Sequence, residues 1–77
     1  MTDTEKLNER IRNSGLKKSY IAGVLGINAS TLSRKINNEL GFNTREITVL
    51  CNLLGITKLK EKEAIFFAER VAETATV

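Results

Sequence analysis

The feature that most constrains the fold is a three-residue break containing glycine, residues 26–28, between two short runs of helical periodicity. Two helices joined by such a turn cross steeply, as in a helix-turn-helix. Ala22 is small enough for the second helix to pass closely over it. Gly26 can adopt the positive φ that the turn needs. Ile27 and Leu32 are apolar and can fill the wedge between the helices.

The rest of the chain also has the patterns of short helices, and β signals are weak. No stretch alternates apolar and polar residues over several positions, and no Asn-Gly or Asp-Gly pair appears. We expect helices over residues 3–14, 18–25, 29–38 and 44–54, and a fifth within residues 57–71. The fold class is therefore all-α, a compact bundle of about five short helices. We expect one domain, residues 1–67, and a tail, residues 68–77, that either takes part in dimerisation or frays.

Helix starts and inward faces follow from the same patterns. Thr2 and Glu5 have the spacing of a capping box, as do Asn43 and Glu46, and Asn28 is a good N-cap. Phe42 should plug the core from the loop before the fourth helix. The expected inward residues are Leu7, Ile11, Ile21, Ala22, Leu25, Leu32, Ile36, Ile47, Leu50, Cys51, Leu54, Leu59, Ile65, Phe66 and Val71.

Charge is distributed unevenly along the chain. The net charge is +3, but residues 10–45 contain seven basic residues and one acid, a net +6. This split favours a cationic surface that faces an anionic partner, and the alternative is a solvated basic face with no partner.

The third helix has an unusual outward face. On a helical wheel, Ser30, Arg34 and Asn37 lie opposite the buried edge formed by Leu32 and Ile36. Ser and Asn are poorer helix formers than the Glu and Lys that serve solubility alone, so this face should approach a partner closely and exchange hydrogen bonds with it. The major groove of double-stranded DNA meets that requirement, because it admits an α-helix and presents base edges to Arg, Asn and Ser.

The segment "KSYIAGVLGINASTLSRKIN" resembles the helix-turn-helix of the phage repressor and Cro family, the lambda-repressor-like or Xre-type regulators. The matching positions are Ala22, Gly26, Ile27 and Leu32, and the resemblance covers about residues 4–67. It implies a DNA-binding domain whose second and third helices form the helix-turn-helix. It also implies a phage or prophage transcriptional regulator, most often a repressor, that binds a palindromic operator as a homodimer in the bacterial cytoplasm, associated with the nucleoid.

The resemblance also implies residue roles. Base readout falls to Ala29, Ser30, Ser33 and Arg34, phosphate contact to Lys18, and further backbone contacts to Asn37 and Asn38. One position departs from the pattern: Lys35 stands where the family often has an apolar residue, and Ile36 takes the inward role.

Several of these residues have plainer alternatives. Arg34 can be solvated or hold a phosphate, and Ser30 can serve only as a first-turn residue. Lys17 and Lys18 are both expected to contact phosphate, and the alternative is that they are ordinary surface lysines. Thr31 is expected to contact the DNA backbone or water. Arg45 begins the fourth helix, where a cation is unfavourable, so we expect it to face phosphate.

Other function classes find little support in the sequence. The chain has no histidine and a single cysteine, Cys51, which we interpret as a buried thiol. We therefore expect no catalytic residues, metal site, cofactor or small-molecule substrate, and no membrane span. The alternative function is a helical protein-interaction module, such as an antitoxin, acting through its C-terminal segment. Phe66 and Phe67 are adjacent there, so one helix cannot bury both against the same core.

Overall fold

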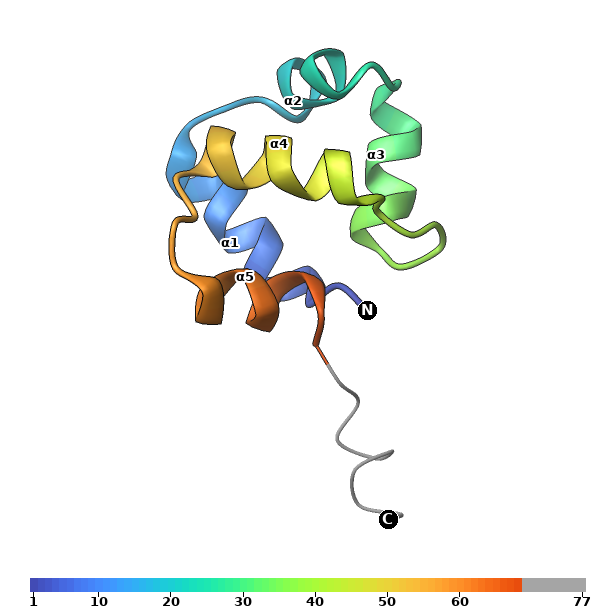
Figure 1. Ribbon diagram of the computed structural model, residues 1–77. Helices are drawn as coiled ribbons and strands as arrows, with labels where there is room; N and C mark the ends of the chain where they lie inside the picture. The colour runs from blue at the N-terminus through green and yellow to red at the C-terminus, as the bar shows by residue number, and fades with distance from the viewer. Residues whose placement is uncertain (69–77) are drawn as a thin grey trace.

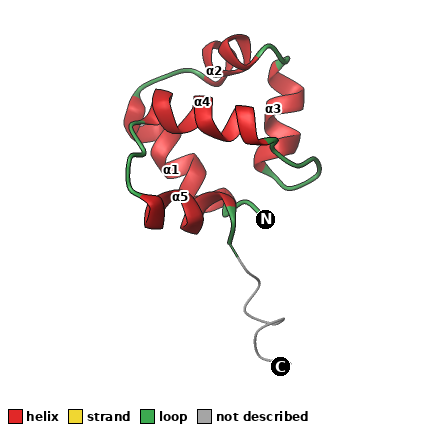
Figure 2. Cartoon of the chain, in the orientation of Figure 1, coloured by secondary structure: helices red, strands yellow, loops and turns green. Residues whose placement is uncertain are grey.

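The computed structural model describes residues 1–68, which form five α-helices and no strand. The helices are α1 (Thr4–Ser14), α2 (Lys18–Leu25), α3 (Ala29–Ile36), α4 (Thr44–Leu54) and α5 (Leu59–Phe66). Figure 1 shows α4 crossing the middle of the bundle, with α2 above it, α3 at its right-hand end and α5 below it. Figure 2 shows that short loops connect all five helices. The predicted all-α bundle of five helices is confirmed.

All five helices contribute to one core. Its buried residues are Leu7, Ile11, Ile21, Ala22, Leu25, Leu32, Ile36, Ile47, Leu50, Cys51, Leu54, Ile56, Ile65 and Phe66. The inward sets expected for the first four helices are confirmed, because their apolar residues recur at the helical period. Phe42 is half-buried and packs edge-on against Phe66, with ring centroids 5.8 Å apart, so it closes the core from the loop as expected.

Two expected features of the first and last helices are wrong. Asp3 caps α1, since its side chain accepts a hydrogen bond from the Lys6 N–H, and Thr2 is instead buried. Leu59 was expected to face inward but is 66 % exposed, because only the last turn of α5 lies on the core. Phe66 is buried and Phe67 is 55 % exposed, so the adjacent rings divide as the sequence indicated. Val71 lies outside the described residues.

The predicted caps of α3 and α4 are confirmed. The Asn28 side chain accepts a hydrogen bond from the Thr31 N–H, and Asn43 and Glu46 form a full capping box. None of the helices within residues 1–68 is long and apolar enough to cross a membrane.

Candidate nucleic-acid interface

The turn after α2 fixes the direction of α3. Gly26 has a φ of 76°, and the Ile27 N–H donates to the Ala22 carbonyl at 3.0 Å, which closes the end of α2. Ala22 and Leu32 are both buried, and α2 packs against α3. In Figure 1, α3 runs steeply away from α2 along one edge of the molecule. This is the geometry of a helix-turn-helix, and it leaves the outward face of α3 free.

The start of α3 is organised by Asn28. Its Oδ1 accepts the Thr31 N–H at 2.7 Å and the Ser30 hydroxyl at 2.9 Å. Because the Ser30 hydroxyl proton is used in this bond, the oxygen lone pairs of Ser30 stay available to an external donor. Thr31 is half-buried and contributes its N–H to the cap.

The outward face of α3 is exposed where base readout was predicted. Ala29, Ser30, Arg34 and Asn37 are exposed, and Ser33 is half-buried at the flank. Within this face the small side chains stand at the N-terminal end of α3, and Arg34 stands one turn further on. A partner could therefore approach the first turn of α3 more closely than a row of long side chains would allow.

Lys17 and Lys18 lie at the N-terminal end of α2 and are exposed. This end has no side-chain cap and no acid in its first turn. Its first backbone N–H groups therefore have no intrahelical acceptor, and both lysines sit at the positive end of the helix dipole. An anion bound here would be favoured by the N–H groups, the dipole and two ammonium groups together.

The guanidinium of Arg45 reaches the C-terminal end of α2, where its Nη1 donates to the Leu25 carbonyl at 3.5 Å. A cation is favourable at that end of a helix, which gives Arg45 a second reason for its position. The side chain is exposed, and its other N–H groups remain available.

Asn38 has a structural role that the sequence did not indicate. Its Oδ1 accepts the Thr2 N–H at 2.9 Å, and its Nδ2 donates to the Thr2 carbonyl at 2.8 Å. Both ends of the amide are used, so Asn38 has a role in the fold. Asn37 and Asn38 are both exposed, and their contact with phosphate stays a prediction.

The contacts of Lys35 explain why a lysine stands at this position instead of an apolar residue. Its Nζ donates to the Gly41 carbonyl and to Glu46 Oε1, both at 2.9 Å, and lies 6.0 Å from the centre of the Phe42 ring. The half-buried ammonium thereby ties the end of α3 to the loop that follows and to the start of α4. In the sequence, Lys35 stands next to the inward Ile36, and Glu46 follows after a short loop. Whether Lys35 and Glu46 pair depends on how that loop folds.

Glu46 is nearly fully buried, and this has an electrostatic consequence. Burial by itself raises the pKa of the carboxyl, but the Asn43 N–H, the hydrogen bond and charge of Lys35, and the charge of Arg45 outweigh it. The pKa is lowered overall, so the group is a carboxylate at neutral pH.

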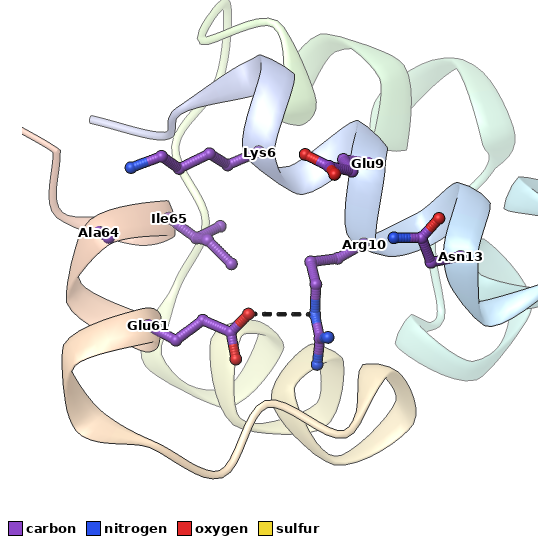
Figure 3. A pocket seen from close by; sticks show the side chains of 7 residues that line it. All are labelled: Lys6, Glu9, Arg10, Asn13, Glu61, Ala64 and Ile65. Atoms are coloured by element: carbon purple, nitrogen blue, oxygen red, sulfur yellow. Dashed lines mark ion pairs between the residues drawn. The ribbon is translucent and has the colours of Figure 1, made fainter.

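One polar groove lies apart from these residues. The groove in Figure 3 lies between α1 and α5, where Arg10 Nε is 3.3 Å from Glu61 Oε2. Arg10 also donates to the Leu54 carbonyl at 2.8 Å, so it caps the C-terminal end of α4. Cys51 is buried, and burial raises the pKa of its thiol. Residues 1–68 hold no cluster of three acidic, histidine or cysteine side chains that could bind a metal ion.

Comparisons with protein-family models, with curated proteins and with solved structures gave no match.

Proposed function

We propose that this chain binds double-stranded DNA in a sequence-specific manner, with α3 in the major groove, as a transcriptional repressor of the phage repressor and Cro type. The observation that carries the proposal is the helix-turn-helix crossing, which leaves a polar, small-residue face of α3 exposed. The uncapped start of α2 adds two exposed lysines.

In this arrangement, base readout comes from the first two turns of α3. Arg34 has the donors for the O6 and N7 atoms of guanine. The free lone pairs of Ser30 suit the amino group of adenine or cytosine. Ala29 permits close approach, and Ser33 reaches the groove from the flank.

Phosphate contacts hold the helix in register. Lys17 and Lys18, together with the free N–H groups at the start of α2, would grip one phosphate segment. Asn37, Thr31 and Arg45 would supply further contacts near the ends of α3 and α4. Each lysine that neutralises a phosphate contributes about −0.9 to the slope of log affinity against log salt concentration.

Two copies would bind a palindromic operator, because a single α3 reads only a few base pairs. Half-sites for such dimers lie about 34–36 Å apart. Phe67 is 55 % exposed and Met1 is 48 % exposed, and their hydrogen-bonded segments lie side by side, since the Ala68 N–H donates to the Met1 carbonyl at 2.9 Å. These exposed apolar groups favour a contact between copies. They equally favour the alternative function, a protein-interaction module of the antitoxin kind.

The test is a fluorescence anisotropy titration with the DNA immediately upstream of the gene, against a scrambled duplex, at several salt concentrations. We expect tighter binding to the upstream DNA and a steep fall in affinity with salt. Arg34→Ala should cost about 1–3 kcal/mol on the preferred sequence and relax the preference at one base pair. Lys60→Ala, at an exposed lysine of α5, is the matched control and should leave sequence preference unchanged.

Two outcomes would contradict the proposal. Absence of binding at low salt would exclude the DNA-binding function and leave the protein-interaction alternative. An equal loss of affinity for both duplexes in Arg34→Ala would make Arg34 a phosphate contact rather than a base-reading residue.

A further inference from the structure

Glu39 is the one acid within residues 10–45, and it lies beside the residue that we assign to base readout. Its Oε1 is 3.7 Å from Arg34 Nε, and the two side chains are 59 % and 56 % exposed. An acid here repels phosphate, so its presence next to Arg34 requires an explanation.

The backbone holds Glu39 in this position. Asn38 takes a left-handed conformation, φ 66°, immediately after the end of α3. The Glu39 N–H then donates to the Arg34 carbonyl at 2.8 Å, and the Asn38 N–H donates to the Lys35 carbonyl at 3.3 Å. This is the hydrogen-bond pattern of a Schellman motif, with asparagine in the position usually taken by glycine. The chain reversal places Glu39 close to Arg34.

The backbone of Thr2 stabilises this chain reversal. The two hydrogen bonds between the Asn38 amide and the Thr2 backbone fix the residue that turns the chain. The position of Glu39 is therefore set by contacts that reach the buried Thr2, although both charged side chains are at the surface.

We propose that Glu39 is a specificity-determining residue, whose carboxylate pairs with the Nε side of the Arg34 guanidinium and so favours orientations in which the two Nη groups face guanine. This inference rests on the DNA-binding function proposed above. Guanine presents two acceptors, O6 and N7, to a pair of parallel N–H groups, and a guanidinium with an ion-pair partner on its Nε side keeps both Nη groups for these acceptors. An exposed ion pair adds little to folding stability, so its contribution lies in the direction that it gives to Arg34.

Glu39 also disfavours phosphate as a ligand of Arg34. Arg34 bound to a phosphate would bring that phosphate close to the Glu39 carboxylate, which is unfavourable. The pair thus weakens contact with DNA in general while leaving contact with guanine available, which is discrimination by a repulsive group.

The experiment uses the full chain and a random library of 20-base-pair duplexes. Sequences are selected with the wild-type protein, and the selected duplex and a scrambled duplex are then titrated with the wild type, Glu39→Gln, Arg34→Ala and the double variant. Glu63→Gln, an exposed acid on α5, is the matched control.

We expect the wild type to select guanine at one position in each half-site. In Glu39→Gln, the affinity for the scrambled duplex rises and the ratio of selected to scrambled affinity falls at least about fivefold, since the repulsion and the orientation are both lost. In the Arg34→Ala background, Glu39→Gln should leave this ratio unchanged. An equal gain on both duplexes in Glu39→Gln alone would overturn the proposal while DNA binding stands.

A second measurement tests the pair of Arg34 and Glu39 in the absence of DNA. The Nε–H proton of Arg34 should exchange with water more slowly in the wild type than in Glu39→Gln, as measured by NMR. Equal exchange rates would overturn the inference directly. If the wild type bound no duplex, the proposed function would fail, and the exchange rates would still report on the contact.

Discussion

Replacing Lys35 with methionine tests the ion pair that joins α3 to α4. Methionine keeps most of the length of the side chain and removes the ammonium, which donates to Glu46 and to the Gly41 carbonyl at 2.9 Å each. The side chains of Lys35 and Glu46 are only 14 % and 5 % exposed, so the carboxylate would be left buried without its cation.

The expected loss follows from these contacts. Breaking a buried pair by removing one partner costs about 3–5 kcal/mol. We expect about 3 kcal/mol, the lower end, because Glu46 keeps the Asn43 N–H at 3.0 Å and water can reach the site through the partly exposed lysine position. This is a large share of the free energy of unfolding of a domain of this size.

The assay is urea unfolding at pH 7, followed by circular dichroism at 222 nm. Lys60→Met, at an exposed lysine, is the control and should change the free energy of unfolding by less than about 0.5 kcal/mol. The double variant Lys35→Met/Glu46→Gln should recover part of the loss, since the carboxylate is then gone. A loss below about 1 kcal/mol for Lys35→Met, or no difference from Lys60→Met, would refute the reasoning.

The same urea unfolding experiment at lower pH tests whether the charge of Glu46 is involved. The pKa of Glu46 in the folded protein lies below its ordinary value of 4.5, so its stabilising contribution is present at neutral pH and is lost as the pH falls through the folded pKa. The difference in stability between the wild type and Lys35→Met should therefore narrow below about pH 4.5. A difference that stays constant down to pH 3 would show that the charge of Glu46 is not involved.

Three further predictions concern single residues. Gly23→Ala should stabilise the protein by about 0.5–1 kcal/mol, because Gly23 is exposed within α2 and an added Cβ meets no atom within 4 Å; a lower melting temperature would contradict this. Asn38→Ala should lower the free energy of unfolding by about 2–4 kcal/mol, since it loses both bonds to Thr2 and strains the left-handed backbone, whereas Asn38→Gly should lie between it and the wild type in urea unfolding. If Asn38→Ala were as stable as the wild type, neither the bonds to Thr2 nor the left-handed backbone at residue 38 would affect stability. Cys51 should react with a thiol reagent much more slowly in the folded protein than in urea, because it is buried and its pKa is raised; equal rates would place the thiol at the surface.

The sequence by itself determined the local elements. Helical periodicity placed the inward residues of α1 to α4, and the side chains of Asn28 and Asn43 marked where α3 and α4 begin. The break at residues 26–28 indicated the crossing of α2 and α3. These features depend on neighbours within one or two turns of helix, which is why a single sequence reveals them.

Only the tertiary structure decided the roles of residues whose partners lie far along the chain. Asn38 bonds to Thr2 across 36 residues, and Arg10 to the Leu54 carbonyl across 44. Both side chains have several possible partners when only their own segments are considered. The packing of α1 against α3, α4 and α5 selects one of them, because a polar group near the core must find its hydrogen-bond partner wherever the fold brings one close.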